Sequence, residues 1–166
     1  MSYHIYTTKG IILSARPLRE ADRIYSILTR DLGLLRASAI GVRKEVSKLR
    51  GSLEPISISK ISLVRGKEYW RITSAEIVEP VPPAPEVMRP MALLEKLVQG
   101  ESVNTELFDA VEGALVSSET SLEMFEVRLA SQILFHLGYL KEEDLGLDKK
   151  ALVRAINEGI EHSHLG

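Results

Sequence analysis

Cysteine is absent from the 166 residues of this chain. Without thiols the chain cannot form disulfides, thiolate zinc sites, iron–sulfur clusters or a cysteine nucleophile, and this composition fits a reducing compartment. Long hydrophobic runs are also missing, because no apolar stretch approaches the ~20 residues of a membrane-spanning helix. The first residues, Met1-Ser2-Tyr3-His4, have no signal-peptide pattern. We therefore expect a cytoplasmic protein that does not associate with a membrane.

Residue patterns typical of catalysis are scarce. The 4 histidines are scattered, and no nucleophile stands beside a base in the sequence. Glu20 and Asp22 are a close carboxylate pair, and such pairs act as general acid and base where their environments separate the pKa values. Their arginine-rich surroundings are more typical of a polar turn with local ion pairs. His162 and His164 could chelate a metal, but a frayed terminus explains them better. We expect no enzyme, no cofactor and no metal.

The formal net charge of −2 conceals a segregation of charge along the chain. Residues 1–80 hold 14 Lys/Arg against 8 Asp/Glu, a balance of +6, and residues 81–166 hold 7 against 15, a balance of −8. Most of the prolines lie where the two halves join, and they favour neither a helix nor a sheet ladder. We predict a basic domain over 1–80, a proline-rich connector over 81–90 and an acidic helical domain over 91–166. The basic domain indicates a polyanionic partner.

Short β-type segments follow one another through the basic half. Each is rich in β-branched or aromatic residues and ends near a turn-forming residue. The predicted strands are Thr8–Arg16, Arg23–Arg30, Leu34–Val42, Pro55–Val64 and Tyr69–Val78. With a basic helix or loop between the third and fourth strands, this order predicts a five-stranded OB-fold-like barrel. Apolar residues change parity at Ser59-Lys60, which indicates either a β-bulge or two separate short strands.

The acidic half has the periodicity of amphipathic helices. We predict helices over Met91–Val98, around Leu107–Leu115, after Thr120 and over Lys149–Glu158. In the third of these, Thr120 and Glu123 form a T-x-x-E capping box. Its apolar stripe consists of Leu122, Phe125, Leu129, Ile133 and Leu137. The predicted fold class is therefore α+β, with an N-terminal barrel followed by a C-terminal α-helical domain.

Candidate nucleic-acid-binding residues concentrate between the third and fifth predicted strands. They are Arg36, Arg43, Lys44, Lys48, Arg50, Arg65, Lys67, Tyr69 and Arg71. Cationic clusters bind phosphates without sequence preference because each contact releases counterions; the alternative is a solvated surface. One strand parity places Trp70 inside the barrel and Tyr69 and Arg71 outside it, where an aromatic ring beside cations could stack on bases. Packing of both aromatic residues in the core is the competing interpretation.

Several segments resemble the RecO family of bacterial recombination mediators. The N-terminal resemblance begins with Arg16-Pro17-Leu18-Arg19-Glu20-Ala21-Asp22-Arg23-Ile24 and continues through Thr29–Gly33, Ala39–Lys44 and Ser47–Pro55. Segments similar to the family's helical domain are Leu94–Leu97, Glu106–Phe108, Phe125–Leu129 and Leu137–Tyr139. The resemblance covers roughly residues 8–140, and its order and spacing are more specific than any single segment.

The resemblance implies an OB-fold followed by a helical domain in a nucleoid-associated bacterial protein. It also implies binding of single- and double-stranded DNA, and annealing of complementary strands. With RecR, such a protein helps to load the RecA recombinase onto DNA coated by single-strand-binding protein. The chain departs from the family in two ways. Many members have a four-cysteine zinc site after the stretch matching Gly138-Tyr139-Leu140, where this chain has Lys141–Leu145 and no cysteine, and the chain is shorter than is usual.

Two other functions are compatible with the same residues. An RNA-binding or translation-associated OB-fold module would share the cationic surface, and matched RNA and DNA oligonucleotides would separate the two. A protein-interaction adaptor could use the basic half to bind an acidic protein, in which case nucleic acid would not bind. The resemblance favours the DNA-binding mediator over both.

Overall fold

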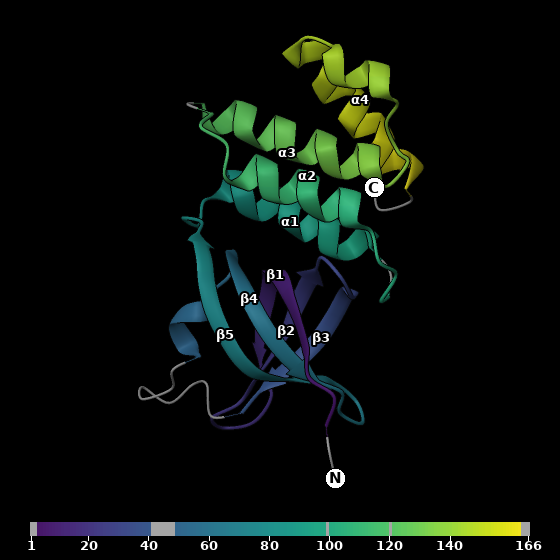
Figure 1. Ribbon diagram of the computed structural model, residues 1–166. Coiled ribbons are helices and arrows are strands. Elements are labelled where there is room, and N and C mark those ends of the chain that lie inside the picture. Colours follow the sequence, from purple (N-terminus) through teal and green to yellow (C-terminus); the bar gives the residue numbers. More distant parts are fainter. Residues whose placement is uncertain (1–2, 41–48, 99, 120, 164–166) are drawn as a thin grey trace. The chain divides into compact units, whose positions relative to one another are not determined.

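The computed structural model describes residues 3–40, 49–98, 100–119 and 121–163. The chain divides into two compact units. The first unit contains residues 1–83 and 99–104, and the second contains residues 84–98 and 105–166. The first is a β-barrel and the second is helical, so the predicted α+β class is confirmed (Figure 1).

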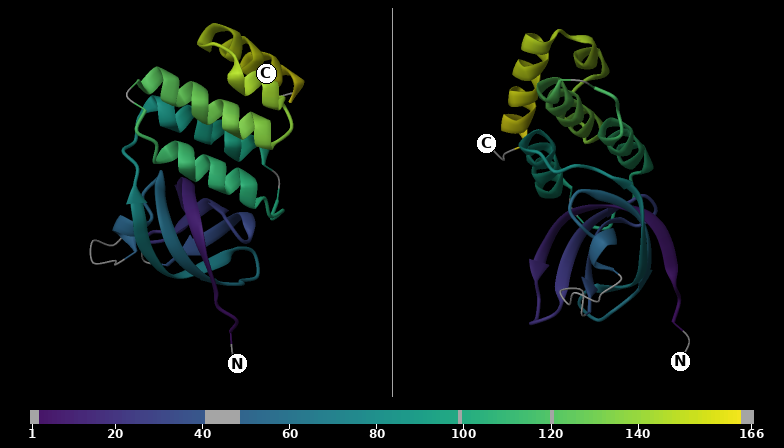
Figure 2. Two further views of the ribbon diagram at one scale, coloured as in Figure 1. Left: turned by 45° about the horizontal axis from the view of Figure 1, so that its top comes forward. Right: turned by 90° about the vertical axis from the view of Figure 1, so that its left-hand side faces the viewer.

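Five strands form a closed barrel in the order β1-β2-β3-β5-β4 (Figures 1 and 2). The pairs are antiparallel except for β3 and β5, which are parallel. This is the five-stranded, OB-type arrangement that the sequence predicts. The strands are β1 (Tyr6–Pro17), β2 (Arg23–Thr29), β3 (Gly33–Ala39), β4 (Ser57–Val64) and β5 (Trp70–Pro80), with a short 3-10 helix, η1 (Arg50–Ser52), before β4.

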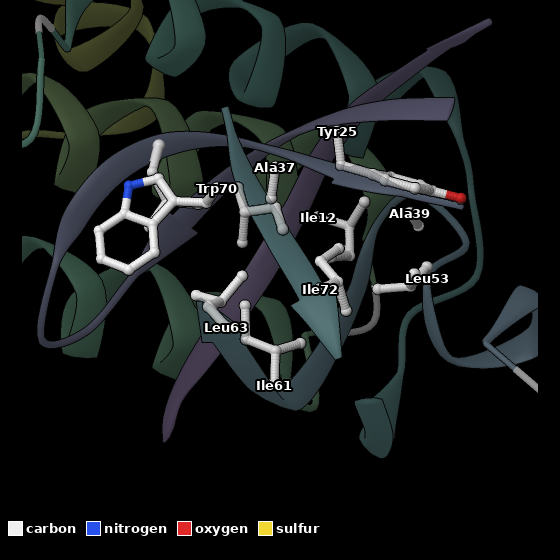
Figure 3. Close-up of a cluster of buried hydrophobic side chains, with 11 residues drawn as sticks. Ile12, Tyr25, Ala37, Ala39, Leu53, Ile61, Leu63, Trp70 and Ile72 are labelled. Carbon is white, nitrogen blue, oxygen red and sulfur yellow. The ribbon is translucent and has the colours of Figure 1, made fainter. Parts of the chain in front are cut away.

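The barrel core is built from inward-facing residues that lie side by side across the strands. Tyr25 pairs with Ala37 across β2 and β3, and Ala37 pairs with Trp70 across β3 and β5. Trp70 is only 4% exposed and belongs to the same buried cluster as Tyr25, Ile12 and Leu63 (Figure 3). The predicted orientation of Trp70 is therefore confirmed, and its ring is part of the core.

The change of parity in β4 does not come from a bulge in that strand. The register between β1 and β4 is continuous, and both Ile58 and Ile61 are completely buried. Residues three apart in a regular strand lie on opposite faces, so β4 has apolar residues buried on both faces. The extra residues lie on β5 instead, where the register with β4 shifts at Thr73 and Val78. The bulge prediction placed the irregularity on the wrong strand because a bulge is defined only by the pairing.

Four α-helices make up the helical unit. Helix α3 contacts each of the other three, and the short 3-10 helix η2 contacts α3 and α4 (Figure 2). In the described part of the chain, no helix combines the length and apolarity needed to cross a membrane. The elements are α1 (Pro85–Leu97), α2 (Thr105–Leu115), α3 (Leu122–His136), η2 (Glu142–Gly146) and α4 (Lys149–His162).

The proline-rich connector extends less far than predicted. β5 ends at Pro80 and α1 begins at Pro85, so only residues 81–84 join them. Pro85 is tolerated because the N–H groups of the first helical turn have no intrahelical partner. Pro90 lies inside α1 and is buried, so packing compensates for the backbone hydrogen bond that it cannot make. Proline density alone overestimated the connector because it does not show where in a helix each ring falls.

Helix α3 begins one residue later than the predicted capping box. Its N-cap is Ser121, whose Oγ accepts a hydrogen bond of 3.3 Å from the backbone N–H of Met124. The predicted cap, Thr120, lies outside the described residues. Leu129 and Ile133 of the predicted stripe are completely buried. Leu122 is exposed because it is the first residue of the helix, at one end of the stripe.

Candidate nucleic-acid interface

One outer face of the barrel carries arginines from three strands. Arg16 of β1 pairs with Ile24 of β2, Ile24 pairs with Ser38 of β3, and Ser38 pairs with Arg71 of β5. The neighbouring row of residues points into the core, and side chains alternate along strands, so this row points outward. Both arginines are exposed. The row therefore has a solvent-facing cation at each end.

A second outward row lies beside the first. Ser14 of β1 pairs with Ser26 of β2, which is buried, and Ser26 pairs with Arg36 of β3, which is exposed. The Arg36 guanidinium can donate hydrogen bonds to phosphate oxygens. We call the two rows together the cationic face, whose charged members are Arg16, Arg36 and Arg71.

A groove of about 850 Å³ adjoins this face. Its walls come mainly from the turn after β1, around residues 18–22, and from the β4–β5 loop, residues 65–69. Four cations line the groove, together with Tyr69, Asp22 and Glu68: they are Arg19, Arg65, Lys67 and Arg71. Three of the four cations are among the sequence-predicted candidates. The tertiary structure thus brings the β4–β5 candidates together with an arginine from the turn after β1.

The turn after β1 contains a local ion pair. The Asp22 carboxylate lies 3.6 Å from an Arg19 guanidinium nitrogen, and Asp22 is buried whereas Glu20 is exposed. The turn is closed by a backbone hydrogen bond of 3.0 Å from the Leu18 N–H to the Asp22 carbonyl. The interpretation as a polar turn with a local ion pair is confirmed. Among the residues that the structure describes, no three His, Asp or Glu side chains gather as metal ligands would.

Arg65 is held against the edge of the barrel core. Its guanidinium carbon lies 4.3 Å from the centroid of the Trp70 ring, within the range of a cation–π contact. The Glu101 carboxylate accepts a hydrogen bond of 2.8 Å from the indole N–H and lies 3.7 Å from an Arg65 nitrogen. The Tyr6 ring packs edge-on to Trp70 at 5.2 Å. Trp70 therefore supports a cation of the groove and does not itself offer a stacking surface.

The predicted candidates fall into two groups. Arg36, Arg65, Lys67, Tyr69 and Arg71 all lie on the cationic face or in the groove. Arg71 is exposed, as the strand parity predicts, whereas Tyr69 immediately precedes β5 and is half-buried. The remaining candidates are Arg43, Lys44 and Lys48, which lie outside the described residues, and Arg50, which lies on η1 and whose side chain is not described.

Sequence reasoning missed Arg16 and Arg19 as candidates. Arg19 stands in a turn beside Glu20 and Asp22, so its charge is explained by a local ion pair and does not by itself indicate a binding site. Arg16 shares a face with Arg71 only because the β1–β2 register shifts between Ile12 and Ser14. A shift of one residue moves every later side chain to the other face, and no local pattern in β1 marks the position of that shift.

Comparison with known proteins identifies the barrel unit. Residues 1–81 match the model of a family described as recombination protein O, N-terminal. A protein named DNA repair protein RecO from Dehalococcoides mccartyi is 46% identical over 76 residues, which cover 46% of this chain and 30% of that protein. The protein of the same name from a Synechococcus species is 44% identical over 91 residues, or 49% of this chain and 32% of that protein.

A third relative of the same name, from Heliobacterium modesticaldum, is 41% identical over 75 residues, covering 45% of this chain and 28% of that protein. The matched segment therefore spans less than a third of the length of these relatives. The matched residues coincide with the barrel that carries the cationic face and the groove. The barrel unit is thus similar to the N-terminal domain of the RecO family.

Proposed function

We propose that the chain is a non-enzymatic recombination mediator that binds and anneals single-stranded DNA and assists recombinase loading in DNA repair. The observation that carries this proposal is the convergence of Arg19, Arg65, Lys67 and Arg71 on one groove of an OB-type barrel. OB-folds bind oligonucleotides with the face of strands 2 and 3 and with the loops that follow strands 1 and 4. The cationic face and the groove occupy these positions.

The chemistry of the groove suits a single strand. Its cations contact phosphates, which gives affinity without sequence preference. Tyr69 lies among those cations and offers an aromatic ring to an unpaired base. Annealing needs no catalytic residue, because a cationic surface reduces the repulsion between two phosphate backbones and raises the local strand concentration. Double-stranded DNA, RecR, single-strand-binding protein and RecA complete the proposed set of partners, on the strength of the family.

A salt titration with a fluorescent oligo-dT strand tests the proposal. Four to six phosphate contacts predict a slope of about −3 to −4 in log affinity against log salt, at roughly 0.7 per contact. The double variant Lys67→Ala, Arg71→Ala should bind more weakly, with a slope about 1.4 shallower, because two contacts are lost. The matched control is Lys150→Ala, Arg154→Ala on α4, where both residues are exposed and the charge change is equal.

The outcome separates the competing functions. The site is wrong if the groove variant and the α4 variant retain the same affinity and slope. Tighter binding to a matched RNA strand than to DNA would favour the RNA-binding module. Absence of nucleic-acid binding at low salt would favour the protein adaptor.

A further inference from the structure

A short segment between α1 and α2 belongs to the barrel unit. Residues 100–104, which we call the strap, separate two helices of the helical unit but group with the barrel. The strap lies close to the turn between β2 and β3 at Gly33, which has a φ of +77°. A Cβ on Gly33 would come within 2.7 Å of the Glu101 backbone carbon and of the Ser102 carbonyl oxygen. The glycine therefore permits a close approach that brings Glu101 to the barrel.

The two oxygens of the Glu101 carboxylate have different partners. Oε1 accepts the hydrogen bond from Trp70 Nε1 at 2.8 Å, and Oε2 lies 3.7 Å from Arg65 Nη2. The Arg65 guanidinium also lies over the Trp70 ring. An anionic oxygen thus lies beside an arginine that lines the groove. Phosphate oxygens bind arginine through the same nitrogens and with the same charge complementarity.

The contacts of Arg65 with Glu101 and with Trp70 differ in how easily they break. The side chains of Arg65 and Glu101 are 64% and 43% exposed, and an ion pair this exposed is weak. The stacking of Arg65 on Trp70 does not involve Glu101, so it persists when the carboxylate leaves. A phosphate can therefore replace Glu101 at an arginine that is already oriented. Until it does so, the carboxylate repels the strand and occupies one cation of the groove.

We propose that Glu101 holds the place of a DNA backbone phosphate at Arg65 in the free protein, and that a bound strand exchanges this carboxylate for phosphate. The inference rests on the proposed function, because it requires a strand in the groove. In this arrangement Arg65, stacked on Trp70, is a phosphate subsite. Glu101 of the strap competes with DNA for this subsite and so limits the affinity for DNA.

The test is the variant Glu101→Gln with a fluorescent oligo-dT strand. Glutamine retains an oxygen that can accept from Trp70 Nε1 and replaces the charged oxygen near Arg65 by an uncharged NH2 group. We expect affinity at low salt to rise roughly 3- to 10-fold. The log–log salt slope should steepen by about 0.7, because the variant has no freed carboxylate to take up a cation when a phosphate binds Arg65. In an Arg65→Ala background, Glu101→Gln should give no such gain.

The matched control is Glu126→Gln. Glu126 lies on α3, pairs with Arg89 at 2.7 Å and is not among the residues that line the groove, and its substitution gives the same change in net charge. The inference is wrong if Glu101→Gln binds like the wild type, or if Glu126→Gln produces an equal gain. If neither the wild type nor any variant binds oligo-dT, it is the proposed function that fails, and the two failures are thereby distinguished.

A second measurement needs no variant. Trp70 is the only tryptophan of the chain, and both Arg65 and Glu101 contact its indole. Saturating the wild-type protein with oligo-dT should change the tryptophan emission, because a phosphate replaces the carboxylate at the guanidinium that lies over the indole ring. Unchanged emission at saturation would contradict the exchange at Arg65.

Discussion

At the residue scale, Tyr25 of β2 is buried in the barrel core, between the strands that carry Arg16 and Arg36. Its side chain is 2% exposed and packs in the same cluster as Trp70. Burial raises the pKa of Tyr25 above its ordinary value of 10.0, and the nearby Arg23 only partly offsets this effect. Because the phenol is neutral when protonated, the folded state holds this proton more tightly than the unfolded state does. The resulting stabilisation is complete below pH 10 and is lost as pH rises through the higher folded-state pKa.

The raised pKa of Tyr25 gives a prediction for the variant Tyr25→Phe. The wild type should lose stability above pH 10, and the variant should lose less over the same range because it has no phenol to ionise in the core. Urea unfolding at pH 8 to 11, followed by circular dichroism, measures the difference. Tyr3→Phe is the matched control, since Tyr3 is 63% exposed. Parallel pH profiles for the wild type and Tyr25→Phe would contradict the argument.

At the scale of one element, the β4–β5 loop positions two cations of the groove. Arg65 and Lys67 flank Gly66, and a Cβ on Gly66 would overlap the Tyr69 carbonyl oxygen. That oxygen belongs to the backbone and cannot rotate away as a side chain can. The tight form of the loop therefore depends on the missing Cβ.

We predict that Gly66→Ala weakens DNA binding by displacing the loop. A loss of about 3- to 10-fold in oligo-dT affinity would correspond to about one weakened contact, since tenfold is 1.4 kcal/mol. Gly113→Ala provides the matched control, because Gly113 lies in α2 and a Cβ there meets open space. The control should retain DNA affinity and gain about 0.5–1 kcal/mol in stability from helix propensity. Equal DNA affinity for both variants would show that DNA binding does not depend on the conformation of the β4–β5 loop.

At the scale of the whole molecule, the barrel unit is discontinuous in sequence. The chain leaves it after Pro83 and returns in the strap, which supplies the hydrogen-bond acceptor for the buried Trp70 N–H. A barrel ending at residue 83 would lack that acceptor. Leaving a buried donor unsatisfied costs about 1–3 kcal/mol.

We predict that a fragment of residues 1–83 melts at a lower temperature than the barrel of the full chain. Emission from Trp70 reports the barrel alone in both proteins, because the chain has no other tryptophan. Glu101→Ala in the full chain should reproduce part of the loss, whereas Glu101→Gln should not. If the fragment melts at the temperature of the intact barrel, the strap contributes nothing to its stability.

Much of the fold could be predicted because it depends on neighbouring residues. All five strands of the barrel were placed to within three residues of their ends from β-branched content and turn signals. Helices were recognised by periodicity, although α1 began earlier and α4 ended later than predicted. Local composition also predicts the charge segregation and five of the candidates: Arg36, Arg65, Lys67, Tyr69 and Arg71.

By itself, the sequence determined which residues form strands, which form helices and which half carries the positive charge, since these properties follow from short stretches of chain. The tertiary structure alone decided the register that aligns Arg16 with Arg71, because a shift at one residue changes the face of all later residues in a strand. It also decided the return of the strap to the barrel. Glu101 reaches Trp70 across 31 positions of sequence, and a contact at that distance is set by packing rather than by any local preference.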